Sequence, residues 1–468
     1  MDDRRPGVDG RSIDLNLHRR GLLAATGMAA AATLAGCATS EPESNTTDDP
    51  PNTTDAPPAE EPTGSLPEGS PSSTTERIGD LVADNAGFAL NLHDRLTAGD
   101  VDNVFVSPYS ISMALAMTYG GAGGDTETAM RETLGFSLGD ETHPAFGELQ
   151  AALDARATTD SSEGSADGEV EAFQLEVANA LWGAADYLFA ETYLDLVDEH
   201  YGGGFNEADF GSDPAAERER INRWVAEATD DRIEDLIPED GLSAQTVLVL
   251  TNAIYFMAGW QLPFDPDDTS ESTVRALDGT ESTVSMMHQN LRTNYADLPG
   301  AQAIELPYVG GQVSMVVIVP DDGAFEAIQD ALTGPTLFGI FEALGDASGD
   351  LRLPSFEYEF DTELGEVLET MGMEAAFGPG ADFSGMVDSG DGPGIDDVFH
   401  KAFVSVDEEG TEAAAATAVV MDESAVESAS ERSFDLTVDR PFLFCIRDRP
   451  TDAVLFLGQV TDVAAAQQ

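Results

Sequence analysis

The segment DEEGTEAAAATAVVMDESAVESASE, from Asp407 to Glu431, places four consecutive alanines among acidic residues. Alanine is the strongest helix former, yet Ala413 to Ala416 have no apolar stripe beside them that would anchor a helix to a core. The sequences on either side, KAFVSVD before and SFDLTV after, alternate as strands do. The segment therefore consists of small side chains that no neighbouring core requires, and an assignment of the fold has to explain them.

The composition predicts a folded protein with a strongly acidic surface. The 468-residue chain has 88 acidic and 21 basic residues, a formal net charge of -67, and Lys401 is its only lysine. Such a surface stays hydrated in molar salt, where the screening length is about 3 Å. We expect a halophile's protein rather than a disordered one, because 42% of the residues are hydrophobic. The same charge repels phosphate, so we expect no nucleic acid as partner.

The pattern of residues at the N-terminus predicts an export signal. Arg19 and Arg20 precede a modestly apolar run, Leu22 to Ala35, which is too short to span a membrane. The two arginines resemble a twin-arginine signal, and LAGC, ending at Cys37, resembles a lipoprotein box. We expect a signal over residues 1–37 and a lipid on Cys37, with a cleaved signal and an incidental cysteine as the alternative. One lipid anchors weakly, so we expect an extracellular, cell-surface protein that is partly shed.

The rest of the chain divides into a linker and one domain. Residues 38–75 are dominated by Ser, Thr, Pro and acidic side chains, which predicts a disordered linker. From Glu76 onward apolar residues recur at helical or strand spacing, so residues 76–468 are assigned to one folded domain. Its helices and strands do not alternate strictly, and two groups of strands are nearly continuously apolar. This pattern predicts an α+β fold with a large covered sheet.

The sequence gives little sign of catalytic or metal chemistry. It contains no H-E-x-x-H, Walker or C-x-x-C motif. GGAGGDT, Gly120–Thr126, lacks the G-K-[ST] ending of a phosphate-binding loop and predicts a turn between helices. His200 is interpreted as a surface or capping residue, and Cys37 and Cys445 lie in contexts too different to predict a disulfide. We expect no catalytic residue, no cofactor and no metal.

From Glu76 to its C-terminus the chain resembles the serpins, a family of serine protease inhibitors. Four stretches in the family's order carry the resemblance: NVFVSPYSI from Asn103, LTNAIYFMAGWQLPF from Leu250, FHKAFVSVDEEGTEAAAAT from Phe399 and LTVDRPFLFCI from Leu436. The last fits the family signature, matched here by Asp439, Arg440, Pro441 and Phe442. The resemblance implies the serpin fold, in which a large central mixed β-sheet and helices carry an exposed reactive-centre loop.

The resemblance also implies a mechanism. In this family a protease cleaves the loop and is trapped as an acyl enzyme while the loop inserts into the main sheet, an established case of strand insertion. Alternate residues of an inserted strand face the core, and here these are Thr411, Ala413, Ala415, Thr417, Val419 and Met421. None is charged, and an unpaired charge on this face would cost several kcal/mol. The alanines would therefore be explained by a second state of the protein, in which the cleaved loop has become a strand of the main sheet.

The resemblance assigns the hinge of this loop to Glu408, Glu409, Gly410, Thr411, Glu412, Ala413, Ala414, Ala415, Ala416 and Thr417. Gly410 is expected to supply backbone freedom for the turn. Glu408 matches a glutamate that pairs with a lysine in relatives. That lysine falls at Ser355 in this sequence, so we expect the ion pair to be missing.

A polar cluster is implied beneath the point where the sheet parts, formed by Ser107, Ser110, Asn252 and His400. Buried polar groups there need partners in both states of the sheet, so they would act as a latch. Ordinary core polarity is the alternative interpretation.

The position of the cleaved bond stays open in the sequence. Counting forward from the hinge places it at Ser424–Ala425, counting back from Pro441 places it near Ser430, and Met421 is a further candidate. Ser, Ala or Met before the bond suits an elastase-like or subtilisin-like protease. No Arg or Lys lies between Lys401 and Arg432, which argues against a trypsin-like target. The acidic residues just before Ser424 would suit a Glu-specific protease, which remains an alternative target.

The function implied by the resemblance is that of a protease inhibitor and not an enzyme. Its partners would be a serine protease, bound covalently, and the membrane, through Cys37, and we expect a monomer. A non-inhibitory serpin that serves as a binding or chaperone-like surface protein is the alternative, against which the small-residue hinge argues. A hydrolase built on this fold is a third possibility, without a motif that supports it.

Overall fold

The computed structural model describes residues 64–72, 75–99, 103–159, 170–171, 173–411 and 432–467. They belong to one structural unit, which extends from Pro58 to Gln468. The predicted signal, its Cys37 and the linker up to residue 63 lie outside the described residues. The same holds for hinge residues 412–417 and for the candidate reactive-bond residues Met421, Ser424, Ala425 and Ser430.

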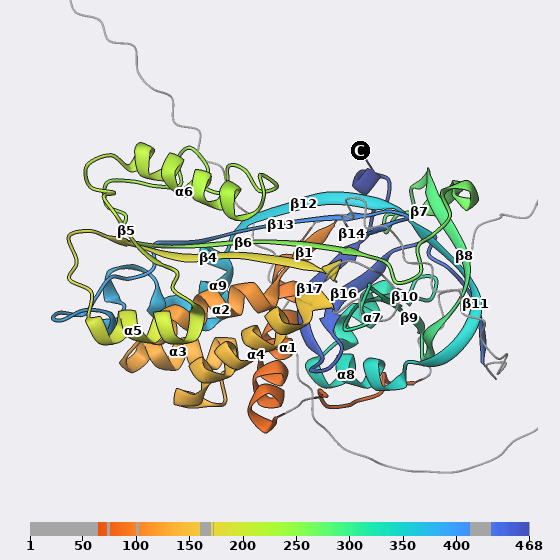
Figure 1. Cartoon of the computed structure of the whole chain (residues 1–468), viewed down its shortest axis with the longest axis horizontal. Helices are drawn as coiled ribbons and strands as arrows, with labels where there is room; N and C mark the ends of the chain where they lie inside the picture. The colour runs from red at the N-terminus through yellow and green to blue at the C-terminus, as the bar shows by residue number, and fades with distance from the viewer. Residues whose placement is uncertain are drawn as a thin grey trace, which may run out of the picture. The chain divides into compact units, whose positions relative to one another are not determined.

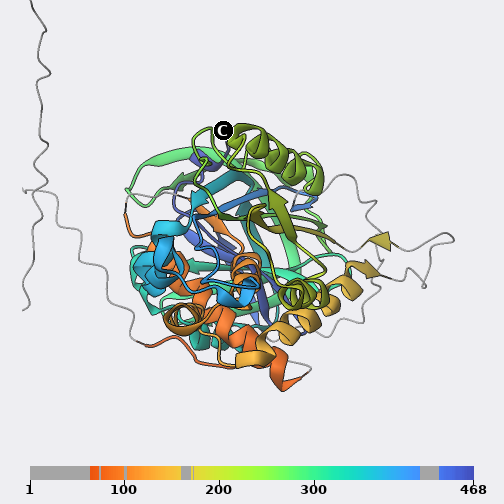
Figure 2. The same cartoon turned by 90° about the vertical axis from the view of Figure 1, so that its left-hand side faces the viewer.

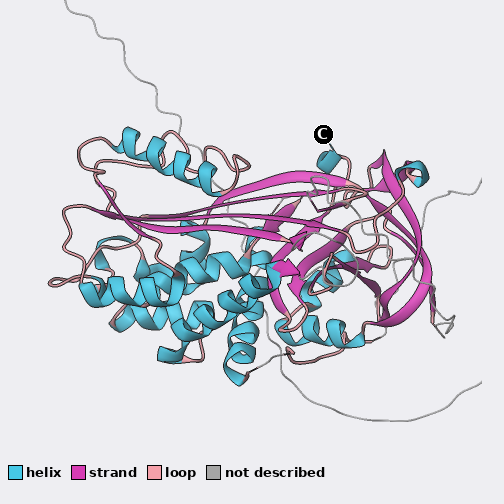
Figure 3. Ribbon diagram, viewed as in Figure 1, coloured by secondary structure: helices cyan, strands magenta, loops and turns pink. Residues whose placement is uncertain are grey.

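A six-stranded mixed sheet runs through the domain (Figure 1, Figure 3). Its strands, in spatial order, are β12 (Phe356–Glu363), β13 (Asp397–Val406), β14 (Gly410–Thr411), β6 (Leu248–Gly259), β4 (Gln174–Ala184) and β5 (Phe205–Ala208). β13 and β6 run parallel, whereas β12 and β4 pair antiparallel with them on their outer sides. The mixed sheet of an α+β fold, expected from the sequence, is confirmed.

Helices cover both faces of this sheet, which is why β6 is apolar nearly throughout (Figures 1 and 2). On one face lie α1 (Glu76–Leu96), α2 (Pro108–Tyr119), α3 (Gly124–Leu134), α4 (Thr142–Ala157), α5 (Glu191–Tyr201) and the short α9 (Gly365–Leu368). α6 (Pro214–Ala228) covers the other face, where Ile221 and Val225 share a buried cluster with Trp182 of β4.

A nine-stranded sheet forms the other half of the domain. It comprises β1 (Val104–Val106), β7 (Ser270–Arg275), β8 (Glu281–Leu298), β9 (Ala301–Pro307), β10 (Val313–Pro320), β11 (Gly345–Pro354), β15 (Ser433–Thr437), β16 (Phe442–Asp448) and β17 (Ala453–Val460). α7 (Phe325–Ala331) and α8 (Gly334–Ala343) belong to this half of the domain. Separately, β2 (Thr158–Thr159) pairs with β3 (Val170–Glu171) in a two-stranded sheet. β11 and β12 follow each other directly in the sequence but join different sheets on either side of Ser355.

The folded part begins earlier than the sequence predicted. Residues 64–72, assigned to the disordered linker, lie against α8, and Leu66 is only 6% exposed. Composition favours disorder in this stretch because it contains few apolar residues. Contacts with a distant part of the chain order it instead, and a local pattern does not encode such contacts.

Candidate functional site

The central feature of the six-stranded sheet is the line along which β13 and β6 pair, here called the seam. Residues Asp397–Ala402 of β13 pair in parallel with Val249–Ile254 of β6. Beyond this stretch the two strands separate, and Thr411 of β14 lies between them, opposite Val406 of β13 and Ala258 of β6. A new antiparallel strand has thus begun at one end of the seam, while the other end is closed by direct pairing (Figure 1).

A tight turn holds the start of this new strand. The Asp407 carboxylate Oδ1 accepts hydrogen bonds from the backbone N–H of Glu409 at 2.8 Å and of Gly410 at 3.0 Å. A Cβ on Gly410 would lie 2.2 Å from the carbonyl oxygen of Ala258, which no real side chain tolerates. The need for glycine therefore comes from this close approach to β6, and not from the freedom in the turn that the sequence suggested.

Trp260 fastens the turn to the end of β6. Its backbone N–H donates to the Glu409 carbonyl at 2.8 Å, and its indole Nε1–H donates to the Asp407 carbonyl at 2.9 Å. Its ring stacks on Tyr308 with centroids 4.7 Å apart. One side chain therefore connects the hinge of the loop to both sheets.

Thr411 is the first side chain of the new strand to face the core. It is 2% exposed, and its hydroxyl Oγ1 lies 2.7 Å from the hydroxyl of Tyr308. Burial raises the pKa of Tyr308, so this hydroxyl stays protonated and neutral. The structure thus gives the inward-facing threonine a paired and uncharged environment.

Glu408 is held by a neutral partner. Its carboxylate Oε1 accepts a hydrogen bond from the Thr269 hydroxyl at 2.6 Å, and its carbonyl accepts one from the Phe264 N–H at 2.9 Å. Ser355, where the sequence comparison placed a missing lysine, bonds to Gln467 instead.

Three residues of the predicted polar cluster lie together across the seam. The amide Nδ2 of Asn252 donates to the Ser110 hydroxyl at 2.7 Å and to Asn179 Oδ1 at 2.5 Å, and its Oδ1 lies 2.5 Å from His400 Nδ1. Asn179 was not anticipated. It lies opposite Asn252 in the register of β4 and β6, so a lone Asn in an apolar strand was the sequence signal that could have revealed it.

His400 contributes the one side-chain hydrogen bond of this cluster that crosses the seam. Its ring is buried, and burial lowers its pKa to about 3, so the imidazole is neutral. Nδ1 faces the acceptor oxygen of Asn252 and therefore carries the proton. Nε2 is buried and has no hydrogen-bond partner among the described residues. Opening the seam would break this bond and leave both groups unpaired.

Ser107 serves a different purpose from the other three. Its hydroxyl accepts from the Ser110 N–H at 3.2 Å, which caps the N-terminus of α2, and donates to the Leu455 carbonyl at 2.6 Å. All twelve residues of α2 are buried. Ser107 thus positions the helix that carries Ser110, and reaches the cluster only through that residue.

The signature residues lie between β15 and β16, away from the seam. Arg440 donates through Nε to the Pro320 carbonyl at 2.8 Å and pairs with Asp439 at 2.9 Å. Phe442 is fully buried and packs edge-to-face on Phe356. With Pro441 between them, these residues shape the entry into β16.

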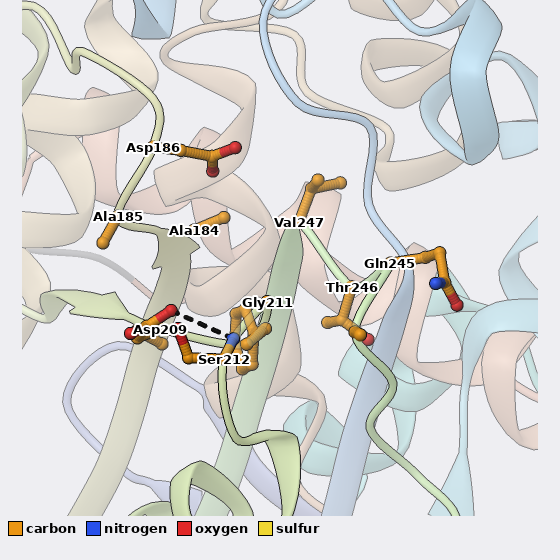
Figure 4. A pocket seen from close by; sticks show the side chains of 12 residues that line it. Ala184, Ala185, Asp186, Asp209, Gly211, Ser212, Gln245, Thr246 and Val247 are labelled. Atoms are coloured by element: carbon orange, nitrogen blue, oxygen red, sulfur yellow. Dashed lines mark hydrogen bonds between the residues drawn. The ribbon is translucent and has the colours of Figure 1, made fainter.

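Elsewhere in the described residues, the structure offers little for catalysis. GFSLG, Gly135–Gly139, has the spacing of a hydrolase nucleophile motif, but it follows helix α3 and not a strand. The exposed Ser137 donates its hydroxyl to Asp84 at 2.9 Å. A cavity of about 200 Å³ at the ends of β4 and β5 is lined largely by alanine and by loop residues, and Asp209 there accepts from the Ser212 N–H (Figure 4).

In the described part of the chain, no group of three or more His, Cys, Asp or Glu is arranged to hold a metal ion. None of the helices in this part combines the length and the apolar character needed to cross a bilayer.

Comparisons with known proteins point in one direction. The family model Serpin (serine protease inhibitor) matches residues 83–463. An uncharacterized serpin-like protein from Thermococcus kodakarensis is 40% identical over 374 residues, which cover 80% of this chain and 83% of that protein. Human antithrombin-III is 34% identical over 403 residues, 84% of each chain.

Solved structures agree with the sequence comparisons. Human thyroxine-binding globulin, in complex with thyroxine, superimposes with a TM-score of 0.70 at 30% identity, covering 83% of this chain and 99% of that one. Uncleaved ovalbumin gives a TM-score of 0.69 at 26% identity, covering 82% and 100%.

Replacing His400 should change how the stability of the domain depends on pH. The folded state holds His400 neutral with a pKa of about 3, whereas the unfolded chain binds a proton near pH 6.5. The contribution of His400 to the free energy of unfolding is therefore fully present above pH 6.5. It is lost as the pH falls toward 3, by about 1.4 kcal/mol per pH unit. In His400→Gln, denaturant unfolding in constant molar salt should show a slope shallower by that amount between pH 6 and 4. The half-exposed His288→Gln is the control, and equal slopes in His400→Gln and wild type would contradict the assignment.

Replacing Gly410 should displace the start of β14. The Cβ of Gly410→Val would collide with the Ala258 carbonyl, so the hydrogen bond from the Trp260 N–H to Glu409 should be lost. We expect hydrogen exchange of the Trp260 amide to rise at least tenfold, while Gly211→Val, at a site with open space, leaves it unchanged. Unaltered exchange in Gly410→Val would show that β14 is not held by this close approach.

Proposed function

Because this chain belongs to the serpin family, we propose that it is a serine protease inhibitor that its target cleaves and consumes, and not an enzyme. The observation that carries the proposal is that Thr411 already forms the start of a new strand between β6 and β13, at one end of the seam. A loop that is cleaved beyond this point can continue as the strand between β6 and β13.

The register of β14 indicates where a continuing strand would lie. Thr411 is opposite Ala258 and Val406, so six residues further Thr417 would come opposite Asn252 and His400. Ten residues further, Met421 would come opposite Leu248, the first residue of β6. The seam can therefore receive the chain as far as Met421, which supports cleavage at Ser424–Ala425 better than near Ser430.

Thr417 suits the position that this register gives it. A strand entering the seam separates His400 from Asn252, whose side chains are buried and need partners. A hydroxyl accepts and donates, so that of Thr417 can accept from His400 Nδ1 and donate to Asn252 Oδ1. The polar cluster would then be satisfied before and after insertion. The alanines between Thr411 and Thr417 provide the small side chains that pass between two packed strands.

The proposed setting of the inhibitor rests on sequence patterns alone. We propose an extracellular protein of halophilic origin, exported by the twin-arginine route, anchored through a lipid on Cys37 and acting as a monomer at the cell surface. The predicted signal over residues 1–37 remains part of this proposal, whereas the linker predicted over residues 38–75 would end before Gly64, because residues 64–72 are docked on the domain. The side chains around Ser424 favour a subtilisin-like or elastase-like target.

A binding function without inhibition is the second candidate. It is favoured by the likeness to thyroxine-binding globulin, whose matched structure holds thyroxine. In that case cleavage of the loop would neither trap a protease nor raise the thermal stability, because no strand would be added to the sheet.

The proposal is tested with subtilisin and the full chain carrying Cys37→Ser, in molar salt. We expect a covalent complex on a denaturing gel, and a released fragment whose mass locates the cleaved bond between Met421 and Ser430. Clean cleavage without a complex, and with no rise in the melting temperature, would favour the binding function. A complex formed without loss of the C-terminal fragment would show that another segment is cleaved.

Thr411→Arg should turn the inhibitor into a substrate. Arginine would bring a charge next to buried Tyr308, where Thr411 now makes a neutral hydrogen bond. We expect the number of inhibitor molecules cleaved per protease trapped to rise at least tenfold. Glu412→Arg is the matched control, because the next residue of a strand faces the other side. Trapping by Thr411→Arg at the wild-type rate would mean that loop insertion is not the mechanism.

A further inference from the structure

The segment Gly64–Ser72, here called the strap, is bound to the domain along its length. The Gly69 N–H donates to the Pro335 carbonyl at 2.8 Å, and the Ser70 N–H donates to the Glu342 carboxylate at 3.2 Å. The Ser72 N–H donates to Asp452 Oδ2 at 2.8 Å. The strap therefore joins both ends of α8 to the turn between β16 and β17 before the chain enters α1.

The surface of α8 is shaped to receive the strap. A Cβ on Gly339, within the helix, would lie 2.2 Å from the Pro67 carbonyl oxygen and 2.7 Å from the Glu68 nitrogen. A Cβ on Gly69 would lie 2.8 Å from the Gly339 nitrogen. Glycine inside a helix costs about 1 kcal/mol relative to alanine. Here it allows backbone to pack directly on backbone, and the buried Leu66 fills the adjacent site.

The strap ends close to the base of the proposed reactive loop. A Cβ on Gly64 would touch Pro299, which directly follows β8. Tyr295 of β8, about 13 Å back along the strand, pairs with Gly345. The Arg432 guanidinium, at the point where the chain returns from the loop, lies 3.0 Å from where a Cβ on Gly345 would be. The N-terminal exit and the return of the loop thus share one end of β8.

We propose that the strap is a docking element that fixes where the N-terminal tail leaves the domain, beside the C-terminal base of the reactive loop. The tail would otherwise leave at the start of α1. The strap lies before residues 83–463, the part of the chain that the family model matches. The consequence for inhibition rests on the proposed function. If the N-terminal tail is attached to a surface, the strap would hold the reactive loop on the side of the domain that faces this surface.

Hydrogen exchange on the full chain tests the docking without any protease. Gly339→Ala favours the helix intrinsically but places a methyl group where the strap lies. We expect exchange of the Gly69, Ser70 and Ser72 amides to rise at least tenfold in this variant. Gly87→Ala, a helix glycine in α1 with open space around it, is the matched control and should leave exchange unchanged. Leu66→Ser weakens the strap from its own side and should act as Gly339→Ala does, so the test does not depend on one variant folding.

Spin-label distances test the exit. Two doubly labelled proteins are made, both with Cys37→Ser. One carries labels at Ser65→Cys and Asp435→Cys, and the other carries labels at Ser65→Cys and Leu188→Cys, the latter as a distant reference site. Burial raises the pKa of the Cys445 thiol to about 12, which keeps it unreactive. We expect a short, narrow 65–435 distribution that broadens in Gly339→Ala, and a longer 65–188 distance. A broad 65–435 distribution in the unaltered strap, or exchange as fast as in free peptide, would overturn the proposal. Failure to trap a protease would leave both measurements unaffected and would contradict only the proposed function.

Discussion

The pairing of β13 with β6 is the constraint on which the rest of the structure depends. Two parallel strands at the centre of a sheet are joined by backbone hydrogen bonds over only part of their length. Where that pairing ends, Thr411 has entered between them. The helices below and α6 above bury both faces of these strands, so a strand added here would be buried at once on both sides. Burial of that kind favours insertion, and the bonds across the seam oppose it.

The bonds that would oppose insertion are local. For a strand to enter, the stretch Asp397–Ala402 would have to release its pairing with β6, and a single imidazole–amide bond adds to that pairing. His400 and Asn252 would both need new partners once the seam opens, because both side chains are buried.

The sequence predicted the fold well because several long stretches carry a family pattern, and because burial on both faces makes strands such as β6 apolar nearly throughout. The site was predicted only in part. Ser110, Asn252 and His400 lie together, but Asn179 joins them through a cross-strand register that a single chain does not reveal. The reason for Gly410 was misjudged, because a close approach to Ala258 depends on a strand more than 140 residues away in sequence, as β6 ends at Gly259. The docking of residues 64–72 was missed for the same reason, since its determinant is Gly339.

The seating of Thr411 has a kinetic consequence. Forming the first contacts of a strand between two others fixes several backbone dihedrals for few hydrogen bonds, which makes initiation the slow step of such assemblies. In this protein the first pair of residues, Gly410 and Thr411, is ordered before any cleavage occurs. Insertion would then be propagation from an existing nucleus, one residue pair after another. Its rate would depend on how fast the seam opens ahead of the advancing strand, and hardly at all on a search by the free loop for its starting register.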